Sequence, residues 1–69
     1  MIRYGTIETV DIERRTGIIM DSNMQDIEFI LPDGPQNFHP GMHVVFEIVF
    51  LKAGLRATDV SEGIYYSLV

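Results

Sequence analysis

Four basic side chains have the clearest potential for chemistry on a ligand. Arg14 and Arg15 are adjacent in the sequence. Lys52 and Arg56 lie four residues apart, later in the chain. Guanidinium and ammonium groups bind phosphates, although isolated basic residues are more often ordinary surface positions. The formal net charge of −5 opposes general attraction to phosphate, so phosphate binding would require a local basic surface.

Metal binding and catalysis find little support. His39, His43 and Glu47 follow one another at intervals of four, a spacing that suits a metal site on a helix. In extended backbone, side chains four residues apart lie ~13 Å apart, too far for one ion. The acidic residues within 21–28 lack the glycine and spacing of a calcium loop. No combination of a serine, a histidine and an acidic residue in this sequence suggests a catalytic triad. We therefore expect no metal, no cofactor and no enzyme activity.

The elements that must position these residues are short strands. Gly, Pro, Asn and Asp punctuate the chain, and the runs between them are rich in Ile, Val and Phe. This spacing is typical of an all-β domain, and no window has a convincing helical period. The pattern predicts five strands, at Arg3–Ile12, Thr16–Met20, Asp26–Leu31, Met42–Leu51 and Leu55–Val60.

Alternation along these strands predicts the core. The spacing from Ile7 to Val10 breaks strict alternation, which predicts a bulge near Thr9. Gly17 is expected to let two backbones approach closely. The expected core residues are Ile7, Val10, Ile12, Ile19, Ile27, Phe29, Leu31, Val44, Phe46, Ile48, Ala57 and Val60.

Length and composition indicate one small domain. A chain of 69 residues can bury one thin core, and 46% apolar residues are enough to pack it. The chain has no cysteine and no apolar stretch approaching the ~20 residues of a membrane span, and we expect no signal peptide at its start because no apolar run of signal length follows Arg3. We expect a single cytoplasmic domain at 1–69, with a barrel core at 4–61, an apolar tail at 62–69 and no membrane partner.

Five short strands with a long connection after the third are the plan of an OB-type Greek-key barrel. We therefore expect a small five-stranded antiparallel barrel. The stretch from Ile64 to Val69 is too apolar for a free end. It would fold back on the barrel, add a short C-terminal strand or pair with another chain.

The sequence also resembles a divergent cold-shock domain, over roughly Tyr4 to Ser61. The segments that carry the resemblance are GTI at 5–7, RTGII at 15–19, DIEFIL at 26–31, FHPGMHVVFEI at 38–48 and ATDV at 57–60. The resemblance implies a module that binds single-stranded RNA or DNA. The binding surface it implies is the outer face of the first three strands, where two motifs supply aromatic rings.

The residues at those motif positions depart from the family pattern. Glu8 and Thr9 stand where the family has Lys-Trp. Residues 14–19 match Lys-Gly-Phe-Gly-Phe-Ile and keep the basic character and one glycine, but neither aromatic. Residues 27–31 match Val-Phe-Val-His-Phe, with a carboxylate for the outward aromatic and an isoleucine for the histidine. Stacking is worth ~1–3 kcal/mol per base, so we expect weak binding at best.

The resemblance leaves seven candidate nucleic-acid-binding residues, including Phe38 as the counterpart of the family's loop aromatic. They are Arg14, Arg15, Ile18, Ile30, Phe38, Lys52 and Arg56.

An alternative use of the outer face is contact with protein. Ile18, Met20 and Ile30 would form an apolar patch between Glu8 and Glu28, and such patches often mark protein contacts. The other possibility is that the tail at 64–69 packs over these residues within the same chain. The alternative function is a protein-interaction or homodimerisation module without nucleic-acid binding. Its candidate residues are Ile18, Met20, Ile30, Tyr65 and Tyr66.

Overall fold

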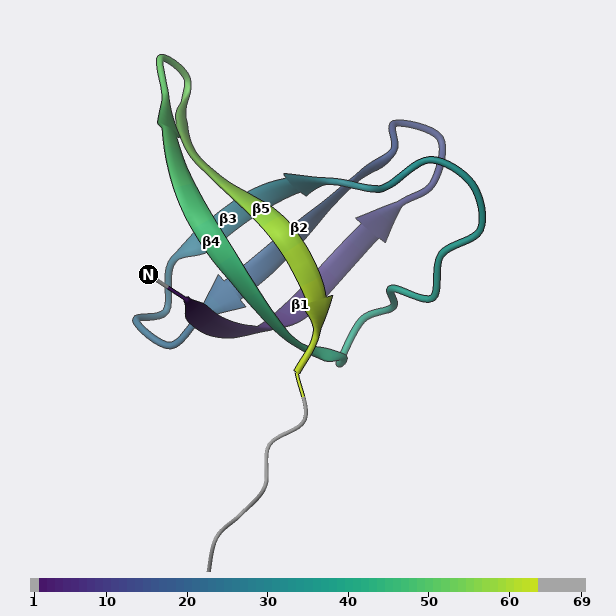
Figure 1. Ribbon diagram of the computed structural model, residues 1–69, viewed down its shortest axis with the longest axis horizontal. Helices are drawn as coiled ribbons and strands as arrows, with labels where there is room; N and C mark the ends of the chain where they lie inside the picture. The colour runs from purple at the N-terminus through teal and green to yellow at the C-terminus, as the bar shows by residue number, and fades with distance from the viewer. Residues whose placement is uncertain (1, 64–69) are drawn as a thin grey trace, which may run out of the picture.

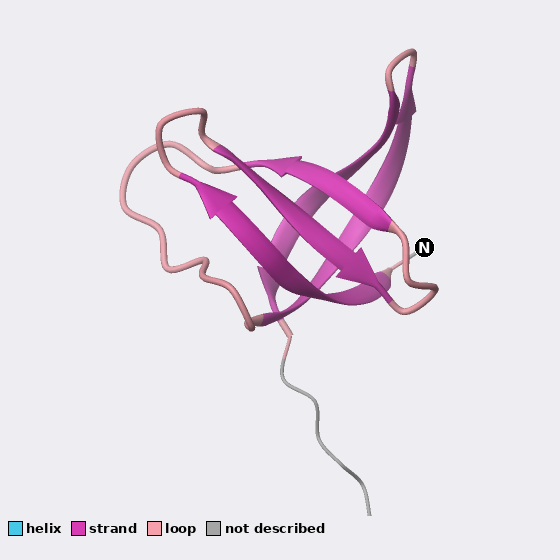
Figure 2. Cartoon of the chain, turned by 180° about the vertical axis from the view of Figure 1, so that it is seen from behind, coloured by secondary structure: helices cyan, strands magenta, loops and turns pink. Residues whose placement is uncertain are grey.

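The computed structural model describes residues 2–63, and within that range the chain forms five strands and no helix (Figures 1 and 2). All five strands predicted from the sequence are present. The tail residues Tyr65 and Tyr66, and the expected extra strand, lie outside the described residues. The strands are β1 (Arg3–Asp11), β2 (Thr16–Asp21), β3 (Asp26–Ile30), β4 (His43–Leu51) and β5 (Gly54–Glu62).

The strands close into a barrel in the order β1-β2-β3-β5-β4, with β4 pairing back onto β1. The expectation of a wholly antiparallel barrel was wrong, because β3 and β5 pair in parallel through Glu28–Arg56 and Phe29–Ala57. The cause is the long connection after β3. It carries the chain across the barrel to the free edge of β1, so β4 pairs there and β5 returns beside β3 in the same direction.

The predicted irregularity in β1 is confirmed. The register of β1 against β2 shifts between Ile7 and Thr9, which leaves Glu8 as the extra residue of a bulge. A close approach at Gly17 is also present, but its nearest neighbour is a side chain and not a second backbone: a Cβ there would lie 2.5 Å from the Phe29 ring and 3.0 Å from the Thr9 carbonyl oxygen. Both features bend the first two strands around the core, as a small closed barrel requires.

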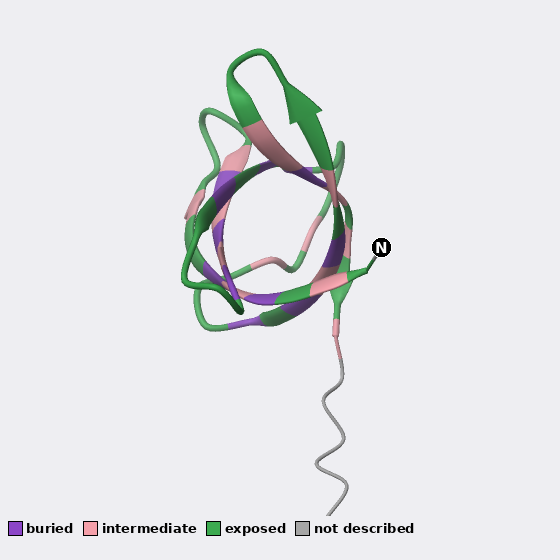
Figure 3. Ribbon diagram, turned by 90° about the vertical axis from the view of Figure 1, so that its left-hand side faces the viewer, coloured by how far each residue is buried: buried purple, intermediate pink, exposed green. Residues whose placement is uncertain are grey.

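The core lies inside the barrel, as Figure 3 shows by the buried segments that line its interior. The buried residues are largely those predicted by alternation: Ile7, Ile19, Ile27, Phe29, Leu31, Val44, Phe46 and Ala57. Val10, Ile48 and Val60 are partly buried against them. Met42, just before β4, also joins the core.

Ile12 was predicted to be core, and this was wrong, because its side chain is 62% exposed. β1 ends at Asp11, and Ile12 begins the turn in which the Arg15 amide donates to the Ile12 carbonyl. Alternation therefore stops one residue before it. Nowhere in residues 2–63 is there a helix long and apolar enough to cross a membrane.

Candidate nucleic-acid interface

The pairing register arranges the outer face of β1–β3 in three rows. Each row has a β2 residue in the middle, flanked by one residue of β1 and one of β3. The rows are Thr6–Met20–Asp26, Thr9–Ile18–Glu28 and Asp11–Thr16–Ile30.

None of these row residues is aromatic, and each row contains a carboxylate. Glu8, in the bulge beside the first two rows, hydrogen-bonds through its side chain to Asp26. That hydrogen bond, with lesser contributions from desolvation and the Asp26 charge, raises the pKa of Glu8 above its usual value. These three rows therefore offer no ring for stacking and repel phosphate.

The apolar side chains of this face are spread over the rows. Ile18 and Met20 are half-buried neighbours along β2, whereas Ile30 is 51% exposed in the row next to Ile18. They lie on one face, as alternation predicts, but Met20 also lines a separate groove.

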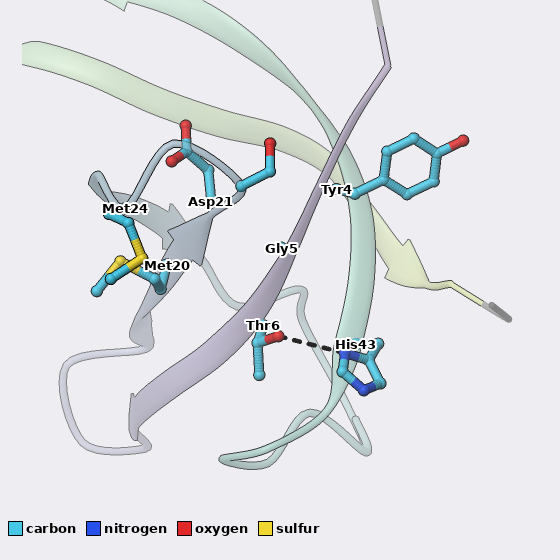
Figure 4. Close-up of a pocket in the computed structure, with 8 residues that line it drawn as sticks. Tyr4, Gly5, Thr6, Met20, Asp21, Met24 and His43 are labelled. Carbon is cyan, nitrogen blue, oxygen red and sulfur yellow. Dashed lines mark hydrogen bonds between the residues drawn. The ribbon is translucent and has the colours of Figure 1, made fainter. Parts of the chain in front are cut away.

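That groove has a volume of about 520 Å³ and runs over β1 at the β2–β3 turn. Figure 4 shows Met20 and Met24 side by side, with Tyr4 directed away from them and Thr6 hydrogen-bonded to His43 at 3.2 Å. Methionine side chains adapt to apolar ligands of varied shape. The lining therefore suits an apolar group better than a phosphate.

Asp21 also lines the groove, but its carboxylate is engaged in holding the β2–β3 turn. Oδ1 accepts hydrogen bonds from the Asn23 and Gln25 amides, both at 2.9 Å. Oδ2 lies 3.6 Å from Arg3. Asp21 therefore serves the fold rather than a ligand, and Arg3, the fifth basic residue, is its partner.

The arginines of the β1–β2 turn have acidic neighbours. Arg14 lies 3.8 Å from Asp11, and both side chains are at least half exposed. Arg15 lies 3.2 Å from Asp33 and also donates to the carbonyl of Pro32. Arg15 is thereby tied to the start of the β3–β4 loop, while Arg14 is the freer of the two.

The other two basic residues come from the opposite side of β3. Arg56 lies in the row of Glu28 and is 3.6 Å from its carboxylate. Lys52 lies in the β4–β5 turn and makes no ion pair within the part of the chain described here. In Figure 1 the β4–β5 hairpin stands at the upper left of the barrel and the β1–β2 turn at the upper right, and Figure 2 shows the same separation from behind.

Phe38 is half-buried in the long loop. Its ring packs edge-on against Phe29, with ring centroids 5.6 Å apart. It also lines a cavity of about 290 Å³ next to Ile30 and Arg56. Part of the Phe38 ring thus completes the core, and only the remainder is accessible to a ligand.

Sequence reasoning gave no role to two exposed aromatic residues. Tyr4 is 51% exposed on the outward side of β1, two residues before Thr6. Phe50 is 82% exposed near the tip of the β4–β5 hairpin. Alternation places Phe50 on the inward side of β4 with Phe46 and Ile48, so the sequence pattern gives no sign of its exposure or of a function. What the sequence does not reveal is that this part of β4 extends past the barrel (Figure 3).

No protein-family model matches this sequence, and a search of curated proteins found no similar sequence. The closed five-stranded barrel and its strand order are compatible with an OB-like fold.

Proposed function

We propose that this chain is an OB-like module, related to cold-shock domains, that binds single-stranded nucleic acid weakly. It holds the strand through phosphate contacts rather than through bases stacked on the sheet. One observation carries this proposal. Arg14 and Arg15 lie in the β1–β2 turn and Lys52 lies in the β4–β5 turn, and the loops at these two positions are the ones with which OB-fold proteins bind oligonucleotides.

The ion pairs of these arginines do not prevent the proposed contacts. An exposed ion pair is worth ~0–1 kcal/mol, so a phosphate can displace Asp11 from Arg14 at little cost. The carboxylates of the sheet face are the larger obstacle, since Glu8, Asp26 and Glu28 would repel a strand lying across β1–β3. Affinity is therefore weak and sensitive to salt.

The test is fluorescence anisotropy with a labelled, short pyrimidine-rich single strand at low and moderate salt. We expect weak binding that falls with salt and falls further in the Arg14→Ala/Arg15→Ala variant. Glu13→Ala, in the same turn, is the matched control and should bind slightly better, because it removes a negative charge. An absence of binding at low salt would contradict the proposal, and a sub-micromolar dissociation constant would contradict the expectation of weak affinity.

A second candidate is a protein-interaction or homodimerisation module. It is favoured by the exposure of Ile30 and by the groove that Met20 lines with Tyr4 and Met24. Its candidate residues remain Ile18, Met20, Ile30, Tyr65 and Tyr66. Light scattering tests the homodimer: a dimer mass that Ile30→Glu or deletion of 64–69 abolishes, together with no oligonucleotide binding, would replace the first proposal with this one.

A further inference from the structure

Phe50 is the most exposed large apolar side chain within residues 2–63, at 82%. It stands at the end of β4, opposite Leu55 of β5. Its neighbours Val49 and Leu51 are also exposed. Figure 3 shows this hairpin standing clear of the barrel. The molecule thus presents an unshielded aromatic ring at a projecting tip.

The pairing of the neighbouring strands explains the exposure. β1 pairs with β4 over His43–Phe46, and β3 pairs with β5 at Arg56 and Ala57. Beyond these positions β4 and β5 have only each other as partners. No strand therefore lies beneath Phe50, although it shares the side of β4 that is buried at Phe46. The ring is held on a paired hairpin rather than on a loose loop.

The charges around this ring complement a phosphate chain. Residues 48–58 contain Lys52 and Arg56 but no carboxylate, in a chain whose net charge is −5. Arg56 is paired with Glu28 of β3 at 3.6 Å, so Lys52 is the cation of this hairpin that remains for a phosphate. Lys52 lies two residues beyond Phe50, in the turn of the same hairpin. An aromatic ring beside a cation is the combination with which proteins bind single strands, because the ring stacks on a base while the cation contacts the backbone.

We propose that Phe50 is the ring on which this module stacks a nucleobase, with Lys52 contacting an adjacent phosphate. This inference rests on the proposed nucleic-acid binding and assigns its stacking residue. It moves the base contact from the sheet face, where the rows carry no ring, to the hairpin that borders it. A lipid surface fits less well, since the hairpin tip offers a single lysine in an acidic chain.

A tryptophan at position 50 reports the contact directly, because the chain has no tryptophan of its own. In Phe50→Trp, we expect a short oligothymidine strand to quench the indole emission as a base stacks on it. Ile2→Trp is the matched control, since Ile2 is also well exposed at 62% but lies at the start of the chain. Its emission should change little.

Affinities of the conservative variants separate stacking from simple apolar contact. Loss of one stacked base corresponds to about 5- to 150-fold weaker binding. We expect that loss in both Phe50→Ala and Phe50→Leu, whereas Phe50→Tyr and the neighbouring Leu51→Ala should bind as the unaltered chain does. Lys52→Ala should lower the salt dependence by about one phosphate contact. Thermal melts should show all of these variants folded, because the side chains are exposed.

The possible results separate the role of Phe50 from the proposed binding of single-stranded nucleic acid. If the unaltered chain binds no oligonucleotide, the proposed function and the role of Phe50 both fall. If it binds through Arg14 and Arg15 while Phe50→Ala binds equally well, only the role of Phe50 falls. Equal binding by Phe50→Leu would show that the ring does not stack. A rise in mass, or a blue shift on lipid vesicles, that depends on position 50 without oligonucleotide quenching would assign the hairpin to a protein or membrane contact instead.

Discussion

The side chains of Glu8 and Asp26 hydrogen-bond to each other on the outer face of the barrel, Glu8 from the bulge of β1 and Asp26 from the first position of β3. Two carboxyl groups can share a hydrogen bond only when one carries a proton. The bond therefore favours the protonated form of Glu8 and raises its pKa. Both residues lie on the surface across which a bound strand would pass.

This pair predicts that nucleic-acid binding strengthens as the pH falls through the raised pKa of Glu8. Protonation removes one negative charge from the face, so repulsion of phosphates decreases. The measurement is anisotropy with an oligothymidine strand, whose bases do not titrate in this range, from neutral to mildly acidic pH. Glu8→Gln should bind more tightly at neutral pH and lose most of the pH dependence. An unchanged pH profile in Glu8→Gln would show that the strand does not cross this face.

The same pair predicts a pH dependence of folding stability. Because the folded pKa of Glu8 is raised above its unfolded value, the folded state binds the proton more tightly. Its stabilising contribution is present below the unfolded pKa and is lost as pH rises through the folded pKa. Urea unfolding of the chain and of Glu8→Gln at a series of pH values isolates this contribution. We expect the variant to gain stability relative to the unaltered chain as the pH rises, and an opposite trend would contradict the assignment.

Much of the fold follows from the alternation of residues, because one side of each strand must face a single core. Ile19, Ile27 and Phe29 are buried as their period of two requires, and the break in that period after Ile7 marks the bulge. The parallel pairing of β3 with β5 depends on which strand β4 pairs with after the long loop. Local sequence patterns do not predict that pairing.

The candidate site was less accessible to prediction from sequence. The ion pairs Arg14–Asp11 and Arg56–Glu28 follow from turn geometry and from strand register. Neither is visible from the charge pattern alone. Phe50 continues the inward alternation of β4, and it is exposed because β4 extends beyond the residues that pair with β1. Alternation predicts which side of a strand a residue occupies, but not whether the barrel reaches that far.

Gly17 should be among the least replaceable residues of the barrel. A Cβ at this position would lie 2.5 Å from the Phe29 ring and 3.0 Å from the carbonyl oxygen of Thr9, so neither ring nor backbone has room to adjust. Overpacking of this kind costs ~1–3 kcal/mol. We expect Gly17→Ala to lower the free energy of unfolding by about that amount in urea titrations. Thr16→Ala, on the outward side of the same strand, should have a much smaller effect and serves as the control.

Phe38 offers a test of whether an aromatic residue of the long loop serves the core or a ligand. Its ring packs edge-on against the buried Phe29, a contact worth ~0.5–1.5 kcal/mol beyond the area it buries. Phe38→Ala should therefore lower the free energy of unfolding by about 1–3 kcal/mol. At a temperature where the variant is folded, we expect its oligonucleotide affinity to remain close to that of the unaltered chain. Phe38→Leu should recover part of the stability, because it restores apolar contact without the ring. A loss of affinity in both variants at full folding would instead place a stacked base on Phe38, beside Ile30 and Arg56, and would move the principal base contact from the hairpin to the long loop.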